Sequence, residues 1–292
     1  MKHISILSLL LFVLLIPSAQ AYIPDFKMIM SRTAENHGRG VYQIIQDVTL
    51  QEEPEALVVR ETWYIKGENQ MRLEVRGRKR LEGLVAMTFI YDGNRRFYVD
   101  PNGAKKVSRP SDEWFEPYFH FRFQKNIKPM MVAAKMAPTE ILEDDKPKKK
   151  VKAFDPNEPR KPQPYVRLSR IGGSVAYAVG EPTPAGANEA LPGMWIEQDH
   201  FLIRKVRFPS QATVTANSYS QYANSLSLAN QSTVSWENRQ VQIQVVSVKP
   251  LPSSGTINKL LTDASLDFGK DPSVAIKLPE IEAVTEFYKR FR

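Results

Sequence analysis

Apolar and polar residues alternate one by one along several stretches of the sequence, and this alternation restricts the possible folds more than any other feature. In residues 71–76, for example, Met71, Leu73 and Val75 alternate with arginine and glutamate. Successive side chains of a β-strand point to opposite faces of a sheet, so the pattern predicts strands with one buried face and one wet face. This arrangement is typical of antiparallel sheets.

Short turns separate many of these stretches, as Asp92-Gly93-Asn94 does between two of them. Turns of this kind join neighbouring strands into hairpins. We expect about ten or eleven strands, which indicates a sandwich or a barrel. The predicted strands cover residues 41–50, 57–66, 71–76, 85–91, 95–99, 165–171, 174–179, 194–199, 201–208, 211–222 and 232–248.

Helical character is found at both ends of the predicted sheet and within it. Residues 22–37 carry an apolar face, and residues 280–291 repeat apolar side chains at helical spacing. Between them, the aromatic segment 114–123 fits either a helix or a strand, whereas residues 128–136 favour a helix. We predict an N-terminal helix, a helical insertion and a helical C-terminal tail. The aromatic segment either packs over the sheet or contacts a partner or a membrane.

The first 21 residues have the parts of a secretory signal peptide. A basic start precedes an apolar run from Ile4 to Ile16, and Ala19-Gln20-Ala21 predicts cleavage after Ala21. The run of 13 residues is shorter than the ~20 that a spanning helix needs, which disfavours an uncleaved membrane anchor. Residues 22–292 are then expected to form a single exported domain.

The chain contains no cysteine, which excludes disulfides, thiolate nucleophiles and cysteine-ligated metal sites. An exported protein without cysteine fits a bacterial periplasm better than a eukaryotic secretory route, where disulfides are common. We therefore predict a periplasmic location.

Residues 143–164 differ in composition from the predicted strands around them. They contain five prolines, seven Lys/Arg and five Asp/Glu, which predicts a solvated, flexible insertion within the domain. Five lysines lie close together at 146–152, so part of the formal net charge of +8 is a local run, and the charge is a poor argument for a polyanionic partner. Contact with anionic lipid head groups is the alternative interpretation.

The sequence contains no recognisable catalytic motif. The three histidines after the signal peptide, His37, His120 and His200, share no metal-ligand spacing, and Gly172-Gly173-Ser174 is not a nucleophile elbow. We predict a protein that is not an enzyme and has no metal and no cofactor. A hydrolase with an unrecognised site is a minor alternative.

Several segments resemble hairpins of the periplasmic outer-membrane lipoprotein carrier superfamily, the LolA/LolB-like proteins. These are ETWYIK and NQMRLE at 61–66 and 69–74, IYDGNRRFYVDP at 90–101, and MWIE at 194–197 with LIRKV at 202–206. The resemblance spans residues 23–251 and implies a half-open antiparallel β-barrel whose concave face holds acyl chains under helical lids. In these carriers an arginine follows the lysine of the second strand and latches the lid, whereas Gly67 follows Lys66 here.

An acyl-chain cavity requires a curved sheet whose inner face is not filled by its own side chains. Methionines suit a lid because their unbranched side chains repack around variable acyl chains, and we assign this role to Met130, Met131 and Met136. A plain packed core is the alternative for all of these residues. The residues predicted to line the cavity are Leu57, Val59, Trp63, Ile65, Met71, Leu73, Phe89, Tyr91, Phe97 and Val99.

The leading hypothesis is a periplasmic protein that binds lipid or lipoprotein acyl chains, in outer-membrane lipoprotein sorting or envelope lipid trafficking. The alternative is a non-enzymatic envelope-stress sensor or protein-interaction module on the same fold. The predicted partners are acyl chains and proteins of the inner or outer membrane. Nucleic acid is excluded as a partner because the chain is predicted to be exported and has no nucleic-acid recognition motif.

Overall fold

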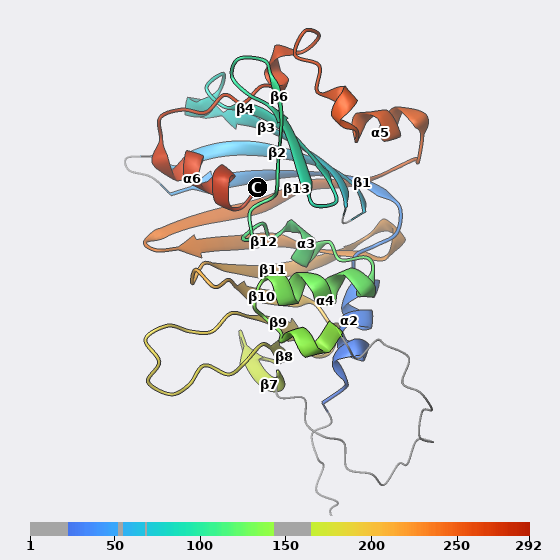
Figure 1. Ribbon diagram of the computed structural model, residues 1–292, viewed down its shortest axis with the longest axis vertical. Coiled ribbons are helices and arrows are strands. Elements are labelled where there is room, and N and C mark those ends of the chain that lie inside the picture. Colours follow the sequence, from blue (N-terminus) through green and yellow to red (C-terminus); the bar gives the residue numbers. More distant parts are fainter. Residues whose placement is uncertain (1–22, 52–54, 68, 143–164) are drawn as a thin grey trace, which may run out of the picture.

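The computed structural model describes residues 23–51, 55–67, 69–142 and 165–292 (Figure 1). The predicted signal peptide at 1–21 and the predicted insertion at 143–164 lie outside the described residues. None of the helices in the described part of the chain is long and apolar enough to span a membrane.

Within these residues, 13 strands form one antiparallel sheet in the order β6-β5-β4-β3-β2-β1-β13-β12-β11-β10-β9-β8-β7. Its two edge strands are not paired with each other, so the sheet stays open, and the predicted half-open barrel with helical cover is confirmed. The strands are β1 (Val41–Leu50), β2 (Leu57–Gly67), β3 (Gln70–Arg78), β4 (Ala86–Asp92), β5 (Arg95–Val99), β6 (Lys105–Ser108), β7 (Val166–Ile171), β8 (Ser174–Val179), β9 (Gly193–Glu197), β10 (Ile203–Arg207), β11 (Thr213–Tyr222), β12 (Leu226–Trp236) and β13 (Arg239–Leu251).

The strand count exceeds the predicted ten or eleven for two physical reasons. The edge strand β6 is short and mostly exposed, so its sequence shows no apolar alternation. The stretch counted as one strand at 232–248, in which residues 236–240 allow a turn or a bulge, is two strands, β12 and β13, joined by a tight turn. That turn contains neither glycine nor proline, so the sequence does not mark it clearly. The positive φ of 49° is adopted by Glu237 instead.

Helices cover the apolar inner face of the sheet, where most of the buried side chains form one cluster. In Figure 1, α3, α4 and α6 lie in front of the sheet and α2 lies beside α4. The aromatic segment whose form was ambiguous becomes α3 and the segment that leads into α4. The helices are α2 (Phe26–Glu35), α3 (Glu116–Phe119), α4 (Gln124–Ala133), α5 (Gly255–Leu260) and α6 (Glu282–Arg290).

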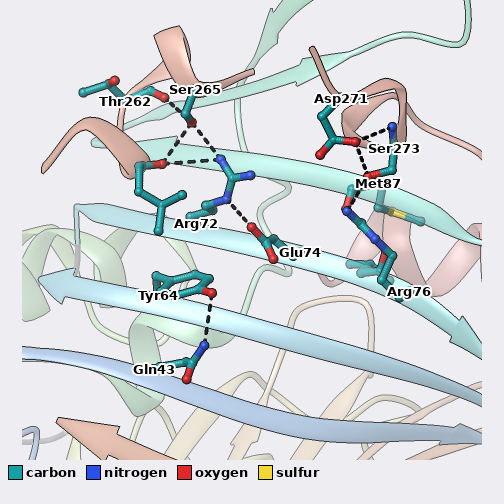
Figure 2. A network of polar contacts seen from close by, with 12 residues as sticks. Gln43, Tyr64, Arg72, Glu74, Arg76, Met87, Thr262, Ser265, Asp271 and Ser273 are labelled. Carbon is teal, nitrogen blue, oxygen red and sulfur yellow. Dashed lines mark hydrogen bonds and ion pairs between the residues drawn. The ribbon is translucent and has the colours of Figure 1, made fainter. Parts of the chain in front are cut away.

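Residues 255–277, which we call the outer strap, cross the opposite face of the sheet over β3, β4 and β5. Figure 2 shows how two arginines of β3 hold it: Arg72 donates to Ser265 Oγ at 2.7 Å, and Arg76 donates to Ser273 Oγ at 2.8 Å. The alternation in β3 predicts that these arginines face water, but the strap leaves Arg72 only 5% exposed. This part of the sheet is therefore covered on both faces.

The end of β3 generates a stability prediction at Gly77. A Cβ atom at this position would lie 1.7 Å from the carbonyl oxygen of Leu81, in the turn that folds back from β3. We expect Gly77→Ala to lower the free energy of unfolding by about 1–3 kcal/mol, the usual effect of overpacking. Urea denaturation measures this change.

Gly67→Ala is the matched control for this variant, because a Cβ at Gly67 would meet no atom within 4 Å. Equal stability of the two variants would show that the turn does not constrain Gly77 as described.

Candidate functional site

Eight of the ten residues predicted to line a cavity lie together on the inner face. They come from β2, β3 and β4, where cross-strand pairs such as Trp63 with Leu73 and Met71 with Tyr91 bring them side by side. None of the eight is more than 4% exposed. The eight are Leu57, Val59, Trp63, Ile65, Met71, Leu73, Phe89 and Tyr91.

The structure corrects the prediction for Phe97 and Val99, which belong to a second cluster beneath the outer strap. Residues paired across an antiparallel sheet share a face, and in β5 Arg96 pairs with Tyr91 whereas Phe97 pairs with Ile90. Arg96 is therefore on the inner face and Phe97 on the outer face. The sequence of β5 misleads here because its apolar positions face the strap rather than the main core.

Aromatic side chains fill the space in front of the eight residues. Tyr91 is stacked between Trp63, at a ring-centroid distance of 5.9 Å, and Trp114, at 4.5 Å. Phe115 and Phe291, whose rings are 6.5 Å apart, belong to the same buried cluster. The inner face is thus packed in this structure, which corresponds to the packed-core alternative.

A buried ion cluster lies within this packing. The side chain of Arg292 is fully buried and donates to both carboxylate oxygens of Glu61, at 2.9 and 3.1 Å. Its Nη1 is 3.2 Å from Glu116 Oε1. Gln46 and Trp63 also donate to Glu61, at 2.7 and 3.1 Å. We call these five residues the Arg292 cluster.

The charges of this cluster stabilise one another against burial. Burial opposes ionisation of Glu116, but Arg292 and His120 outweigh it and hold the pKa of the Glu116 carboxyl below its usual value. Burial likewise opposes the charge of Arg292, yet Glu61 and Glu116 raise its pKa above the usual value. Sequence reasoning missed this cluster, although one signal was present: Glu61 occupies an inward position of β2 between Val59 and Trp63.

The three predicted lid methionines have different environments. Met131 and Met136 are almost fully buried in the core. Met130 is half-buried and lines a cleft of about 620 Å³ between α4 and the turns that follow β2 and β4, which we call the mouth cleft. The cleft borders the aromatic stack because Trp114 belongs to both. Other side chains that line it are Asn69, Asn94, Tyr118 and Asn126.

Arg122 fastens the segment between α3 and α4 to the sheet. It donates to the carbonyl oxygens of His37, Gly40 and Lys66 and lies over the ring of Tyr42. The resemblance implies a latching arginine at position 67, on the strand, where this chain has Gly67. Here a guanidinium from the lid side reaches the end of β2 instead.

Two further clefts lie away from the eight residues of the inner face. One of about 940 Å³ runs beside α2 and includes Arg32, His200 and Arg204 in its lining. Another of about 800 Å³ lies between β3 and the outer strap, with Arg76 and Lys277 in its lining. The mouth cleft differs from both in its contact with the aromatic stack.

Comparisons with known proteins find solved structures of low sequence identity. No family model and no curated protein sequence matches the chain. Three solved structures are similar over 82% of it: an outer membrane lipoprotein-sorting protein domain from Vibrio parahaemolyticus (13% identity, 97% of that chain, TM-score 0.48), a LolA superfamily protein from Nitrosomonas europaea (10%, 98%, 0.48) and a DUF1329 family protein from Desulfovibrio piger (8%, 97%, 0.49). At these identities and TM-scores the similarity is distant and assigns no ligand to the chain.

Arg122 provides a test of the lid attachment. We expect Arg122→Ala to lower the free energy of unfolding by about 2 kcal/mol, because it removes charge-assisted hydrogen bonds to partly buried carbonyls. Amides of residues 116–137 should then exchange faster with deuterium than in the unmodified protein. Lys125→Ala, at an exposed position of α4, is the control, and equal exchange in the two variants would contradict this role of Arg122.

His37 generates a prediction of pH dependence. Burial, with a smaller contribution from His120, lowers the pKa of His37 from 6.5 to about 3. Below pH 6.5 the unfolded chain therefore binds a proton at His37 that the folded protein does not bind. The free energy of unfolding thus decreases as the pH falls from 6.5 towards 3. His37 should account for about 2 kcal/mol of lost stability between pH 7 and pH 5.

Urea denaturation at the two pH values measures this loss, and His37→Gln should reduce it. His200→Gln is the matched control, because the His200 side chain is 74% exposed. An unchanged pH dependence in the His37 variant would contradict the assignment.

Proposed function

We propose that this protein binds the acyl chains of lipids or lipoproteins in the periplasm, in lipoprotein sorting or lipid trafficking of the envelope, and that it is not an enzyme. The observation that carries the proposal is the mouth cleft, which borders the Tyr91 stack of the apolar sheet face through Trp114. Its volume of about 620 Å³ lies within the range of about 300–1,000 Å³ typical of small-molecule sites. The predicted signal peptide and the absence of cysteine support the location.

The cover of the inner face is suited to movement. It consists of short helices, and α4 contains Pro129, which cannot donate a backbone hydrogen bond. Because α3 and α4 are not strands of the sheet, they can shift without breaking strand pairing. An acyl chain that enters beside Met130 would replace side-chain contacts with its own, at about 0.8 kcal/mol for each methylene removed from water.

A protein-interaction or envelope-stress sensor module on the same fold is the second candidate. The packing of the inner face favours it, because all eight inward residues are already buried by side chains of the protein itself. In that case the proteins bound would be partners from the inner or outer membrane.

Purification without detergent, followed by lipid extraction and mass spectrometry, tests the leading proposal. We expect lipid to copurify with the protein and a fluorescent fatty acid to bind to it. Met130→Glu should weaken binding of the fatty acid by at least about tenfold, because a carboxylate in the cleft would have to be desolvated beside the acyl chain.

Val246→Glu is the control, since Val246 is 51% exposed on β13 and does not line the mouth cleft. Lipid-free protein that binds no fatty acid would overturn acyl-chain binding and favour the sensor module.

A further inference from the structure

The helix α6 and the two residues after it are docked on the inner face of the sheet. Phe287 and Phe291 are fully buried, and their rings lie 6.3 and 5.1 Å from that of Trp236 on β12. Figure 1 shows α6 in front of the sheet, outside the strand order. It follows that α6 can leave this position without breaking a strand pair.

Arg292 lies in a cage that has the chemistry of a cation site. The guanidinium carbon is 5.5 Å from the ring centroid of Trp63, 4.6 Å from that of Phe115 and 5.0 Å from that of Phe287. The carboxylates of Glu61 and Glu116 contact the same guanidinium. Proteins hold cationic groups in this way, with carboxylates and aromatic faces together.

Most of this cage is built by elements other than α6. Glu61 and Trp63 belong to β2, Glu116 belongs to α3, and Phe115 precedes it. Hydrogen bonds from Gln46 and Trp63 hold Glu61 in place independently of α6. If α6 moved away, the buried Glu61 would lose its counter-charge and Glu116 would retain the His120 imidazole at 3.1 Å but lose Arg292, which is strongly unfavourable.

Tyr91 is a second indication of a ligand at this position. Its side chain is fully buried, and its hydroxyl has no hydrogen-bond partner in the described part of the chain. Burial raises the pKa of Tyr91, whereas the charges of Arg96 and Arg292 lower it and those of Glu61 and Glu116 raise it. A buried hydroxyl without a partner beside a caged cation is a polar group that a bound head group could satisfy.

We propose that α6 is a built-in occupant of the acyl-chain site and that Arg292 takes the place of the cationic group of the ligand. The ligand class is then an amphiphile with an apolar tail and an ammonium or guanidinium group. The inference rests on the proposed function and extends its site, because the tail would reach beyond the mouth cleft, which α6 does not line, into the space that Phe287 and Phe291 fill. Ligand binding and docking of α6 exclude each other.

The net positive charge of the protein opposes the binding of a cationic ligand. The chain carries a formal charge of +8, so non-specific attraction favours anionic amphiphiles. A preference for a cationic amphiphile would have to come from a local site whose attraction exceeds this non-specific repulsion of cations. The charge of the preferred head group therefore distinguishes binding at the proposed site from non-specific attraction by the net charge of the protein.

Dodecylammonium and dodecanoate have the same chain length and opposite charges, and their binding to the full-length protein can be compared by calorimetry below their micelle concentrations. We expect dodecylammonium to bind about 10-fold tighter, because it replaces the counter-charge of two buried carboxylates. Binding should also accelerate deuterium exchange in residues 282–292. Equal or tighter binding of dodecanoate would overturn the proposal, and so would binding of dodecylammonium that leaves exchange in α6 unchanged.

Glu61→Gln should abolish the preference for dodecylammonium, whereas Glu197→Gln, which alters a buried carboxylate elsewhere, should retain it. The comparison of the two amphiphiles on the unmodified protein does not depend on either variant folding. If neither amphiphile binds, the proposed function fails together with this inference. If both bind equally well and release α6, acyl-chain binding stands and only the cationic preference fails.

Discussion

An open sheet with one apolar face must be covered by other elements, and this constraint organises the whole molecule. The 13 described strands do not close into a barrel, so the sheet cannot enclose its own inner face. Short helices perform this task in place of a second sheet. Because they lie outside the hydrogen-bonded ladder, the face is buried by contacts that are individually weak and can be exchanged for others.

The Arg292 cluster is the polar exception within this apolar cover. Removing charges from water is unfavourable, and a buried ion pair is often no more stabilising than well-packed apolar side chains. The Arg292 cluster instead fixes the position of α6, because Arg292 contacts Glu61 and Glu116 only when α6 is correctly docked. The cluster therefore specifies where the cover sits more than it strengthens the fold.

The sequence predicts the strands well where one face is buried and the other is wet, as in β2 and β3. It predicts less where a later segment decides the environment. The apolar residues of β5 face the outer strap, and Arg72 is buried by that strap, which lies about 190 residues further along the chain. Alternation identifies which residues share a face, but it does not say which face receives the main core. The inward position of Glu61 could have been predicted from the alternation along β2, whereas its partner Arg292 could not.

The strand order has a consequence for how the chain folds. The central strand β1 pairs with β2 on one side and with β13 on the other. The partner on the second side begins at Arg239, so one edge of β1 stays open until most of the chain is available. Pairing over such sequence distances is slow, and an exposed apolar strand edge is prone to aggregation in the meantime. During synthesis, the β1 edge that pairs with β13 therefore stays unpaired until β13 has been made, although β1 lies at the centre of the finished sheet.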